Sequence, residues 1–384
     1  MPGSQEPPFV TLGDVRAAAA RIAGRVVRTP LVPFAAAEPG RPLWLKPESL
    51  QPTGAFKLRG AFNAILQRLD DARAHGVVTH SSGNHARAVA WVARELGLRA
   101  VIAMPDAAPA VKVDAVRRLG AEVVTVTPEE RDTRAFELAA EHGYVMIPPY
   151  DDVAVVAGQG TVGLEIAADL PGAGAVLVPV SGGGLIGGVA TAVKALSPAT
   201  RVIGVEPELA GDAAESFRTG ERVAWTAAQT YRTVADGLRT TSVGEIPWRQ
   251  IQQYVDDVIT VSEAEILDGV RRLAADARLV AEPSGAVAFT AYLHRTGKLG
   301  TGSPLVAVVS GGNIAAGTLA GILSAPARPA SGAAGDQQIR EPPDPSGGLE
   351  AGRPSTGTNG GEQALPGAVP LSAARGWCLA CRPD

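Results

Sequence analysis

Short apolar runs rich in β-branched residues alternate with longer, alanine-rich amphipathic stretches from about residue 77 onward. The runs VVTH (77–80), RAVIAM (99–104) and EVVTV (122–126) predict strands, and the stretches at 84–96 and 111–119 between them predict helices. Parallel strands need a crossover connection of about this length, and that connection is usually a helix. The pattern therefore predicts an α/β fold with mostly parallel sheets that are covered by helices on both faces.

The same alternation continues to about residue 310. Further strands are predicted at 144–147, 175–180, 201–206, 255–261 and 305–310, and further helices at 133–142, 158–170, 189–196 and 262–277. Turn-forming clusters near residues 50–54 and 148–152 interrupt the alternation. We therefore expect two domains: a large one built from residues 1–69 and 148–324, and a small α/β domain, residues 70–147, inserted into it.

The apolar periodicity ends near residue 325. Residues 325–384 are rich in proline, glycine, serine and charge, and they carry too little apolar surface to offset the entropy of ordering. We expect a disordered tail. Its last residues include Cys378 and Cys381 in a CxxC pattern, but two cysteines do not complete a zinc site, which requires four ligands.

Composition narrows the class of protein. The 384 residues are 46% hydrophobic and 19% charged, with a net charge of −4, so there is no basic surface to predict nucleic acid or an anionic membrane as a partner. No apolar run reaches the roughly 18 residues of a membrane span, and the N-terminus has no signal-peptide pattern. We expect a soluble, cytoplasmic protein that acts on a small molecule.

Four loops at strand–helix junctions carry candidate chemistry, and the first contains Lys57. This lysine follows Phe56 in the segment TGAFKLRGA, where Gly54 and Gly60 allow close backbone approach. Apolar surroundings and a helix N-terminus both disfavour the ammonium form, which prepares an amine to attack a carbonyl. The alternative is a lysine whose stem packs while its amine reaches water.

The second loop, HSSGNHA, follows the strand at 77–80. Ser81, Ser82, Asn84 and the backbone amides form a group of donors suited to a carboxylate, and Asn84 could also bond a phenolic oxygen. Each of these residues could equally be an ordinary helix cap. His85 alone is weak evidence for a site.

The third loop, VPVSGGGLIGG (178–188), opens a helix with a run of glycines. Consecutive N–H groups without side chains can surround a phosphate. The spacing of Gly182, Gly184 and Gly187, with Glu206 at the end of the next strand, also imitates a dinucleotide-binding motif. An NAD-dependent dehydrogenase is therefore an alternative.

The fourth loop, VVSGGNI (308–314), places Ser310 at a strand end, where its hydroxyl could meet a ring nitrogen. It could also be a plain Gly-Gly turn. One cofactor would use all four loops, since pyridoxal 5′-phosphate has an aldehyde, a phosphate, a phenolic oxygen and a pyridine nitrogen. The dinucleotide alternative leaves Lys57 and the HSSGNHA loop without a role.

In these motifs the chain resembles the fold-type II pyridoxal-phosphate enzymes, in the branch of serine/threonine dehydratases (threonine ammonia-lyases) and serine racemases. The resemblance covers roughly residues 10–323 and rests on a combination of motifs: TGAFKLRGA, HSSGNH, AGQGT, VPVSGGGL, ADG, EPSGA and SGGN. It implies a two-domain fold like that of the tryptophan synthase β subunit, with the cofactor in the cleft between the domains.

The resemblance also implies roles for individual residues. Lys57 matches the Schiff-base lysine, Phe56 the residue packed on the pyridine ring, and Ser82 the serine on the opposite face of the cofactor. Ser181 departs from the pattern, because many relatives have a glycine there, although its hydroxyl could bond the phosphate. The full cofactor-binding set is Phe56, Lys57, Asn84, Ser181, Gly182, Gly183, Gly184, Leu185 and Ser310, and the substrate-binding set is Ser81, Ser82, Gly83, Asn84 and His85.

A metal site is implied by the same resemblance. Glu206, the carbonyl of Ala210 and Asp212 match a divalent-cation site of relatives. Oxygen ligands completed by water suit Mg²⁺ or Ca²⁺. The alternative is that both acids are purely structural.

The expected reaction is dehydration and deamination of L-threonine, L-serine or a related 3-hydroxy amino acid to a 2-oxo acid and ammonia. Serine racemase is the main alternative, because Lys57 and Ser82 would supply acid/base groups on both faces. The PPYDD stretch (148–152) resembles dehydratases more than racemases. An inactive pyridoxal-phosphate-binding protein is a more remote alternative. We also expect a homodimer or homotetramer.

Overall fold

A six-stranded sheet forms the centre of the larger part of the protein in the computed structural model, which describes residues 9–127, 130–300 and 302–325. Its strand order is β1-β2-β10-β7-β8-β9, and every neighbouring pair is parallel except β1 with β2. The strands are β1 (Val32–Pro33), β2 (Leu43–Pro47), β7 (Ala175–Pro179), β8 (Arg201–Pro207), β9 (Asp257–Val261) and β10 (Leu305–Val309). The prediction of a mostly parallel α/β fold is confirmed.

Alternate residues of these strands enter two different cores. In β10, Ala307 and Val309 pack with the helices α12 (Glu263–Asp276) and α13 (Pro283–His294). Val306 and Val308 pack instead with α8 (Gly184–Leu196) and α11 (Glu245–Tyr254) on the other face. Both faces are apolar because both are covered, as expected for parallel strands.

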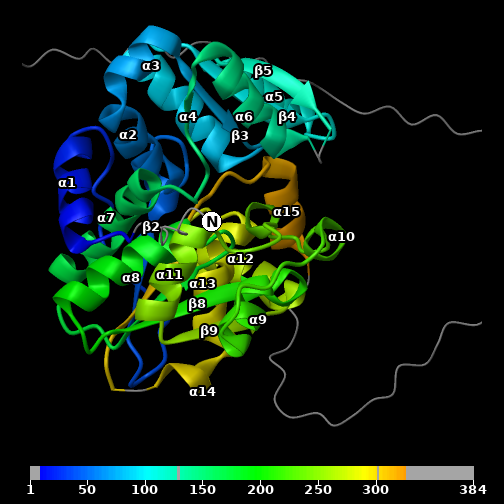
Figure 1. Ribbon diagram of the computed structural model, residues 1–384. Coiled ribbons are helices and arrows are strands. Elements are labelled where there is room, and N and C mark those ends of the chain that lie inside the picture. Colours follow the sequence, from blue (N-terminus) through cyan, green and yellow to red (C-terminus); the bar gives the residue numbers. More distant parts are fainter. Residues whose placement is uncertain (1–8, 128–129, 301, 326–384) are drawn as a thin grey trace, which may run out of the picture. The chain divides into compact units, whose positions relative to one another are not determined.

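A second, four-stranded sheet has the order β5-β4-β3-β6, and all its neighbours are parallel. In β4, Ile102 packs towards α4 and Val101 towards α6, so this sheet is also covered on both faces. Figure 1 shows its strands with α4, α5 and α6 beside them. These elements are β3 (Val77–His80), β4 (Ala100–Pro105), β5 (Glu122–Val126), β6 (Val145–Met146), α4 (Asn84–Leu96), α5 (Ala110–Arg117) and α6 (Arg131–His142).

The remaining described helices connect and flank the two sheets. They are α1 (Leu12–Ile22), α2 (Lys57–Gln67), α3 (Leu69–His75), α7 (Val153–Asp169), α9 (Asp212–Thr219), α10 (Ala227–Thr230), α14 (Thr296–Leu299) and α15 (Ala316–Ser324), with the short 3₁₀ helices η1 (Glu48–Leu50), η2 (Glu208–Ala210) and η3 (Asp236–Leu238). Two helices begin earlier than the apolar pattern predicts. Helix α7 is capped by the Asp152 side chain, which accepts from Val155 N, and α8 begins within the glycine run.

Glycines let α2, α7 and α8 pack with their backbones almost in contact. A Cβ at Gly158 of α7 would lie 2.7 Å from Gly60 Cα on α2, and a Cβ at Gly188 of α8 would lie 2.7 Å from Gly160 Cα. The AGQGT motif therefore has a packing role at this crossing. This packing sets the position of the N-termini of α2 and α8, where Lys57 and the glycine loop lie.

A buried ionic network links α2 to β2, η1 and α7. Arg59 is fully buried and pairs with Glu48 (Nε to Oε2, 2.8 Å) and with Glu165 on α7 (Nη1 to Oε1, 2.7 Å). Lys46 of β2 also reaches Glu165, at 2.6 Å. The two cations and two carboxylates compensate one another in the protein interior, which makes the removal of any one member costly.

Three sequence predictions are left as they stood. The described residues belong to one compact unit, so the boundaries at residues 70 and 147 stay a prediction. The tail from residue 326 lies outside the described residues. The helices described here are all too short or too polar to cross a bilayer, and the cytoplasmic location stays a prediction.

Candidate active site

The turn that precedes α2 lies against the end of β10. Gly54 adopts a left-handed conformation with a φ of 76°, Ala55 forms a β-bridge with Gly311, and Phe56 N donates to Ser310 O at 3.1 Å. Two of the four predicted loops, more than 250 residues apart in sequence, are therefore joined by backbone contacts. Lys57 begins α2 directly after this junction.

Lys57 is half-buried, and its amine lies between backbone and aromatic groups. Nζ donates to Pro149 O at 2.7 Å and lies 5.1 Å from the centroid of the Phe56 ring. Burial lowers the pKa of Lys57 from its ordinary value of 10.5 to about 8. Near neutral pH, a larger fraction of Lys57 than of an exposed lysine therefore carries the neutral, nucleophilic amine.

The HSSGNHA loop connects β3 to α4, and its polar groups make one local and two long-range hydrogen bonds. Ser81 Oγ accepts from Gly83 N at 3.1 Å, and Ser82 is half-buried in the same loop. Asn84, the first residue of α4, donates from Nδ2 to Glu282 Oε1 at 2.6 Å. Its Oδ1 accepts from Asn313 Nδ2 at 2.7 Å. The second loop thus contacts the fourth loop, to which Asn313 belongs.

His85 is buried and neutral. Its Nε2 lies 2.9 Å from the carbonyl oxygen of Ile147, which can only accept, so Nε2 carries the proton. Burial, reinforced by the charge of Lys57, lowers the pKa of His85 to about 3. Nδ1 is a buried acceptor without a hydrogen-bond partner in the described part of the chain. This makes it a candidate acceptor for a substrate donor.

Gly182, Gly183 and Gly184 of the third loop have no room for side chains. Ser181 and Gly183 have φ angles of 56° and 84°, and α8 begins at Gly184. A Cβ at Gly182 would lie 2.5 Å from Cδ1 of the Tyr150 ring. The Ser181 hydroxyl lies 2.9 Å from that of Thr240, an arrangement that the sequence did not predict. Bare backbone at a helix N-terminus, as in Gly182–Leu185, is suited to a phosphate.

Ser310 completes the set at the end of β10. It is buried, and its Oγ donates to Ser284 O at a long 3.4 Å. The C-terminal ends of β2, β7 and β10 meet at one edge of the parallel sheet, so Lys57, the glycine loop and Ser310 all follow that edge. Ligands bind at this edge in open α/β sheets.

The two acids of the predicted metal site are close enough to interact. Burial raises the pKa of Asp212 to about 7, and burial together with the Asp212 charge raises the pKa of Glu206 well above its usual range. Glu206 Oε2 accepts from Ala214 N at 3.0 Å. Glu206 Oε1 and both carboxylate oxygens of Asp212 have no hydrogen-bond partner among the described residues. Ala210, which lies between the two acids in the sequence, is buried in η2.

These acids do not form a complete metal centre. No group of three or more His, Cys, Asp or Glu side chains in residues 9–127, 130–300 and 302–325 is arranged to hold a metal ion. A cation bound here would need the Ala210 carbonyl and water as further ligands. The unpaired carboxylate oxygens fit a cation, but the donor set from side chains alone is too small.

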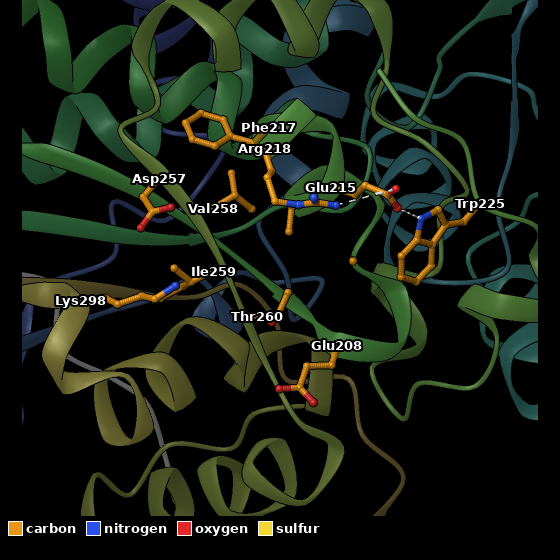
Figure 2. A pocket seen from close by; sticks show the side chains of 12 residues that line it. Glu208, Glu215, Phe217, Arg218, Trp225, Asp257, Val258, Ile259, Thr260 and Lys298 are labelled. Atoms are coloured by element: carbon orange, nitrogen blue, oxygen red, sulfur yellow. Dashed lines mark hydrogen bonds and ion pairs between the residues drawn. The ribbon is translucent and has the colours of Figure 1, made fainter. Parts of the chain in front are cut away.

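A hollow of about 580 Å³ lies over the edge strand β9, and none of its lining residues belongs to the four loops. Figure 2 shows Glu215 between Arg218 and Trp225, whose indole Nε1 donates to it at 2.7 Å. The rim mixes acids with bases such as Lys298, and it contains none of the predicted site residues. We assign this hollow no chemistry.

Three residues at the site were not predicted. Tyr150 packs on the glycine loop, Glu282 binds Asn84, and Asn313 binds both Asn84 and the Thr53 carbonyl (2.8 Å). Each belongs to a motif that the sequence analysis quoted without giving these residues a role: PPYDD, EPSGA and SGGN. The signal was therefore visible, but the contacts that give it meaning are tertiary.

Comparison with known proteins agrees with this geometry. The chain is 40% identical over 308 residues to the L-threo-3-hydroxyaspartate ammonia-lyase of Saccharomyces cerevisiae, covering 79% of this chain and 93% of that protein. It is 39% identical to the L-threonine ammonia-lyase of Thermotoga maritima, covering 80% and 76%. The structure of maize serine racemase superimposes with a TM-score of 0.77 at 37% identity, covering 82% and 97%. The family model described as "Pyridoxal-phosphate dependent enzyme" matches residues 22–311, and the chain belongs to this family.

Proposed function

We propose that the protein is an ammonia-lyase that converts L-threonine, L-serine or a related 3-hydroxy amino acid to a 2-oxo acid and ammonia. The observation that carries this proposal is the junction at the sheet edge, where Phe56, the residue before Lys57, donates from its backbone to Ser310 O. The Lys57 amine itself donates to Pro149 O, and the next residue, Tyr150, packs on the glycine loop. Two similar proteins named as ammonia-lyases add support. Family membership removes the reason to favour a dinucleotide at the glycine motif.

The residues fit pyridoxal 5′-phosphate. Backbone amides of the loop Ser181–Leu185 would hold the phosphate, Lys57 the aldehyde, Asn84 the phenolic oxygen and Ser310 the ring nitrogen, with Phe56 packed on the ring. Side chains of Tyr150 and Pro247 lie where a Cβ on Gly182 or Gly183 would be, so both positions require glycine. Their backbone N–H groups, at the start of α8, suit a phosphate. When bound, the cofactor supplies an electron sink for a carbanion at the substrate Cα.

The chain's own residues would handle the proton and the substrate. The Lys57 amine, in its neutral form, takes the proton from the substrate Cα, and loss of the β-hydroxyl follows. The net reaction balances, since one 3-hydroxy amino acid gives one 2-oxo acid and one ammonia, with the water that is lost returned in hydrolysis. The donors of Ser81, Ser82 and Gly83 would hold the substrate carboxylate. Ser310, a neutral partner, leaves the ring a milder electron sink than a carboxylate partner would.

Serine racemisation is the second candidate, because a protein of that name superimposes well and Ser82 lies in the same loop as Asn84. If Ser82 is an acid/base group on the face opposite Lys57, Ser82→Ala should abolish D-serine formation while part of the L-serine elimination survives. If it only shapes the substrate site, elimination should fall moderately, by roughly tenfold, as for the loss of one hydrogen bond. Chiral chromatography of L-serine reactions, with Ser303→Ala at an exposed position as the control, distinguishes the two.

We propose further that Glu206, the Ala210 carbonyl and Asp212 bind Mg²⁺ or Ca²⁺, supported by three buried carboxylate oxygens without partners among the described residues. Binding to the folded state alone should stabilise it by about 2.7 kcal/mol when the free ion is at 100 times its Kd. The chelated protein should therefore melt at a higher temperature when either ion is added, and Glu206→Ala should remove this response. Glu208→Gln, an exposed neighbour, is the control. An unchanged melting temperature in the wild type would leave both acids with a structural role only.

The oligomeric state and the division into two domains stay predictions. We expect a homodimer or homotetramer, and a large domain of residues 1–69 and 148–324 with residues 70–147 inserted. Sedimentation of the full chain tests the first, and limited proteolysis near residues 70 and 147 tests the second.

A further inference from the structure

Glu282 is a buried carboxylate whose hydrogen-bond partner is an amide. It occupies the N-cap position of α13, yet its side chain does not cap that helix. Oε1 instead accepts from Asn84 Nδ2 at 2.6 Å, and a Cβ on Gly311 would clash with the same oxygen. Buried carboxylates are usually paired with a cation, as Glu48 is with Arg59. A carboxylate that points to a site residue instead of an available helix end indicates a role at that site.

A chain of hydrogen bonds that runs from Arg87 to Glu282 sets the direction of the Asn84 amide. Arg87, which can only donate, donates to Asn313 Oδ1. Asn313 Nδ2 must then face acceptors, and it donates to the Thr53 carbonyl and to Asn84 Oδ1. Asn84 Nδ2 is left to face Glu282, which accepts. The chain of bonds thus ends in one group that can only donate, Arg87, and in two that can only accept, the Thr53 carbonyl and the Glu282 carboxylate. If the side-chain amide of Asn84 or Asn313 flipped, two donors would face each other.

Charged groups from three other elements face Glu282. Burial is the main cause that raises the pKa of Glu282, to about 7, and the Asp236 charge on η3 raises it further. Lys112 on α5 and Arg87 on α4 act in the opposite direction. Lys112 and Asp236 also pair with each other at 2.6 Å, with about 37% and 38% of their side chains exposed. Glu282 therefore changes charge within the pH range in which the protein is expected to work.

We propose that Glu282 is a positioning residue of the active site, whose ionised carboxylate orients the Asn84 amide so that its second N–H remains available to the bound cofactor. This inference rests on the proposed role of Asn84 as the partner of the cofactor's phenolic oxygen. In the ionised form the bond to Asn84 is charge-assisted. Protonation leaves a weaker, neutral bond and a hydroxyl that can itself donate, so the hold on Asn84 is relaxed.

The test is a pH titration of the holoenzyme between pH 5.5 and 9, followed by the visible absorbance of the bound cofactor and by kcat/KM. The wild type should show a transition near pH 7 in both, with kcat/KM falling roughly tenfold on the acid side, as expected when a charge-assisted bond becomes neutral. Glu282→Gln keeps an acceptor oxygen for Asn84 but cannot titrate, so this transition should disappear. Glu245→Gln, an exposed acid at the start of α11, is the control for the substitution itself.

Two surface variants provide a second test with opposite signs. Asp236→Asn removes the charge that raises the Glu282 pKa, so the transition should move to lower pH. Lys112→Gln removes a charge that lowers it, so the transition should move to higher pH. Both shifts should shrink in high salt, because these side chains are partly exposed. This pair keeps the proposal testable even if Glu282→Gln does not fold.

The outcomes separate this inference from the proposed function. An absorbance transition that disappears in Glu282→Gln supports the positioning role even if no substrate yields a 2-oxo acid, in which case the proposed function alone is wrong. A transition that persists unchanged in Glu282→Gln overturns the positioning role. So would shifts of Asp236→Asn and Lys112→Gln in the same direction, or no shift in either variant.

Discussion

Replacing Lys57 with alanine is expected to lower kcat for 2-oxo acid release by about 10⁴-fold or more while the fold is retained. A general base typically contributes roughly 10²–10⁴-fold, and the same amine would also hold the cofactor covalently. The glycine loop and Ser310 do not depend on Lys57, so some cofactor should still bind. The control is Lys298→Ala, since Lys298 is exposed and lies at the β9 hollow.

Lys57→Ala should not lower the stability of the folded protein. Burial lowers the pKa of Lys57 to about 8 in the folded protein, against an ordinary value of 10.5. The folded state therefore binds the proton less tightly than the unfolded chain does, so this amine opposes folding as the pH falls below about 10.5, and the effect is complete below about pH 8. The alanine variant should melt no lower than the wild type at pH 7. Borohydride reduction followed by peptide mapping should label Lys57, and a label on another lysine would contradict the assignment.

Arg59→Met is expected to destabilise the protein by roughly 3–5 kcal/mol, the cost of removing one partner from a buried ionic group. Arg59 is fully buried and bonded to Glu48 and Glu165. Burial opposes the ionisation of Glu48, but Arg59 outweighs it and holds the pKa of that carboxyl below its usual range. Without Arg59, the buried Glu48 must either take up a proton or remain charged without its cation.

Denaturant unfolding measures this loss, and an exposed ion pair provides the control. Arg272 pairs with Asp276 on α12 at 3.0 Å, with about a third of each side chain exposed, so Arg272→Met should cost no more than about 1 kcal/mol. If both variants lost the same free energy of unfolding, the buried network would stabilise α2 no more than an exposed ion pair does. Because Arg59 follows Lys57 by two residues, partial unfolding there should also reduce cofactor binding.

The alternation of apolar runs was sufficient to predict the parallel sheets, because strands covered on both faces show a clear contrast with amphipathic helices. It was insufficient for α13, whose sequence PSGAVAFTAYLH is apolar on almost every side because the helix is buried. It also gave no indication of the network around Arg59. A charged residue in an amphipathic pattern reads as solvent-exposed, and only tertiary contacts reveal that Lys46, Glu48 and Arg59 are buried together.

The same limit applies at the site. Lys57, Asn84 and Ser310 were recognisable because their motifs lie at strand–helix junctions, and the sheet brings such junctions to one edge. Partners such as Glu282 and Tyr150 were not recognisable, since nothing local requires Glu282 to ignore its own helix and bind Asn84 instead. The sequence suggested a phosphate as the partner of the Ser181 hydroxyl. In the structure this hydroxyl lies beside the hydroxyl of Thr240.

The central claim is that this chain eliminates and deaminates 3-hydroxy amino acids faster than it inverts them. One reaction tests it most directly: holoenzyme with L-serine, and separately with L-threonine, sampled over time for 2-oxo acid and, by chiral chromatography, for D-serine. Loss of the β-hydroxyl competes with reprotonation at Cα, and inversion wins only where a proton is delivered quickly to the opposite face. We expect 2-oxo acid to form much faster than D-serine, and D-serine outpacing 2-oxo acid would contradict the account.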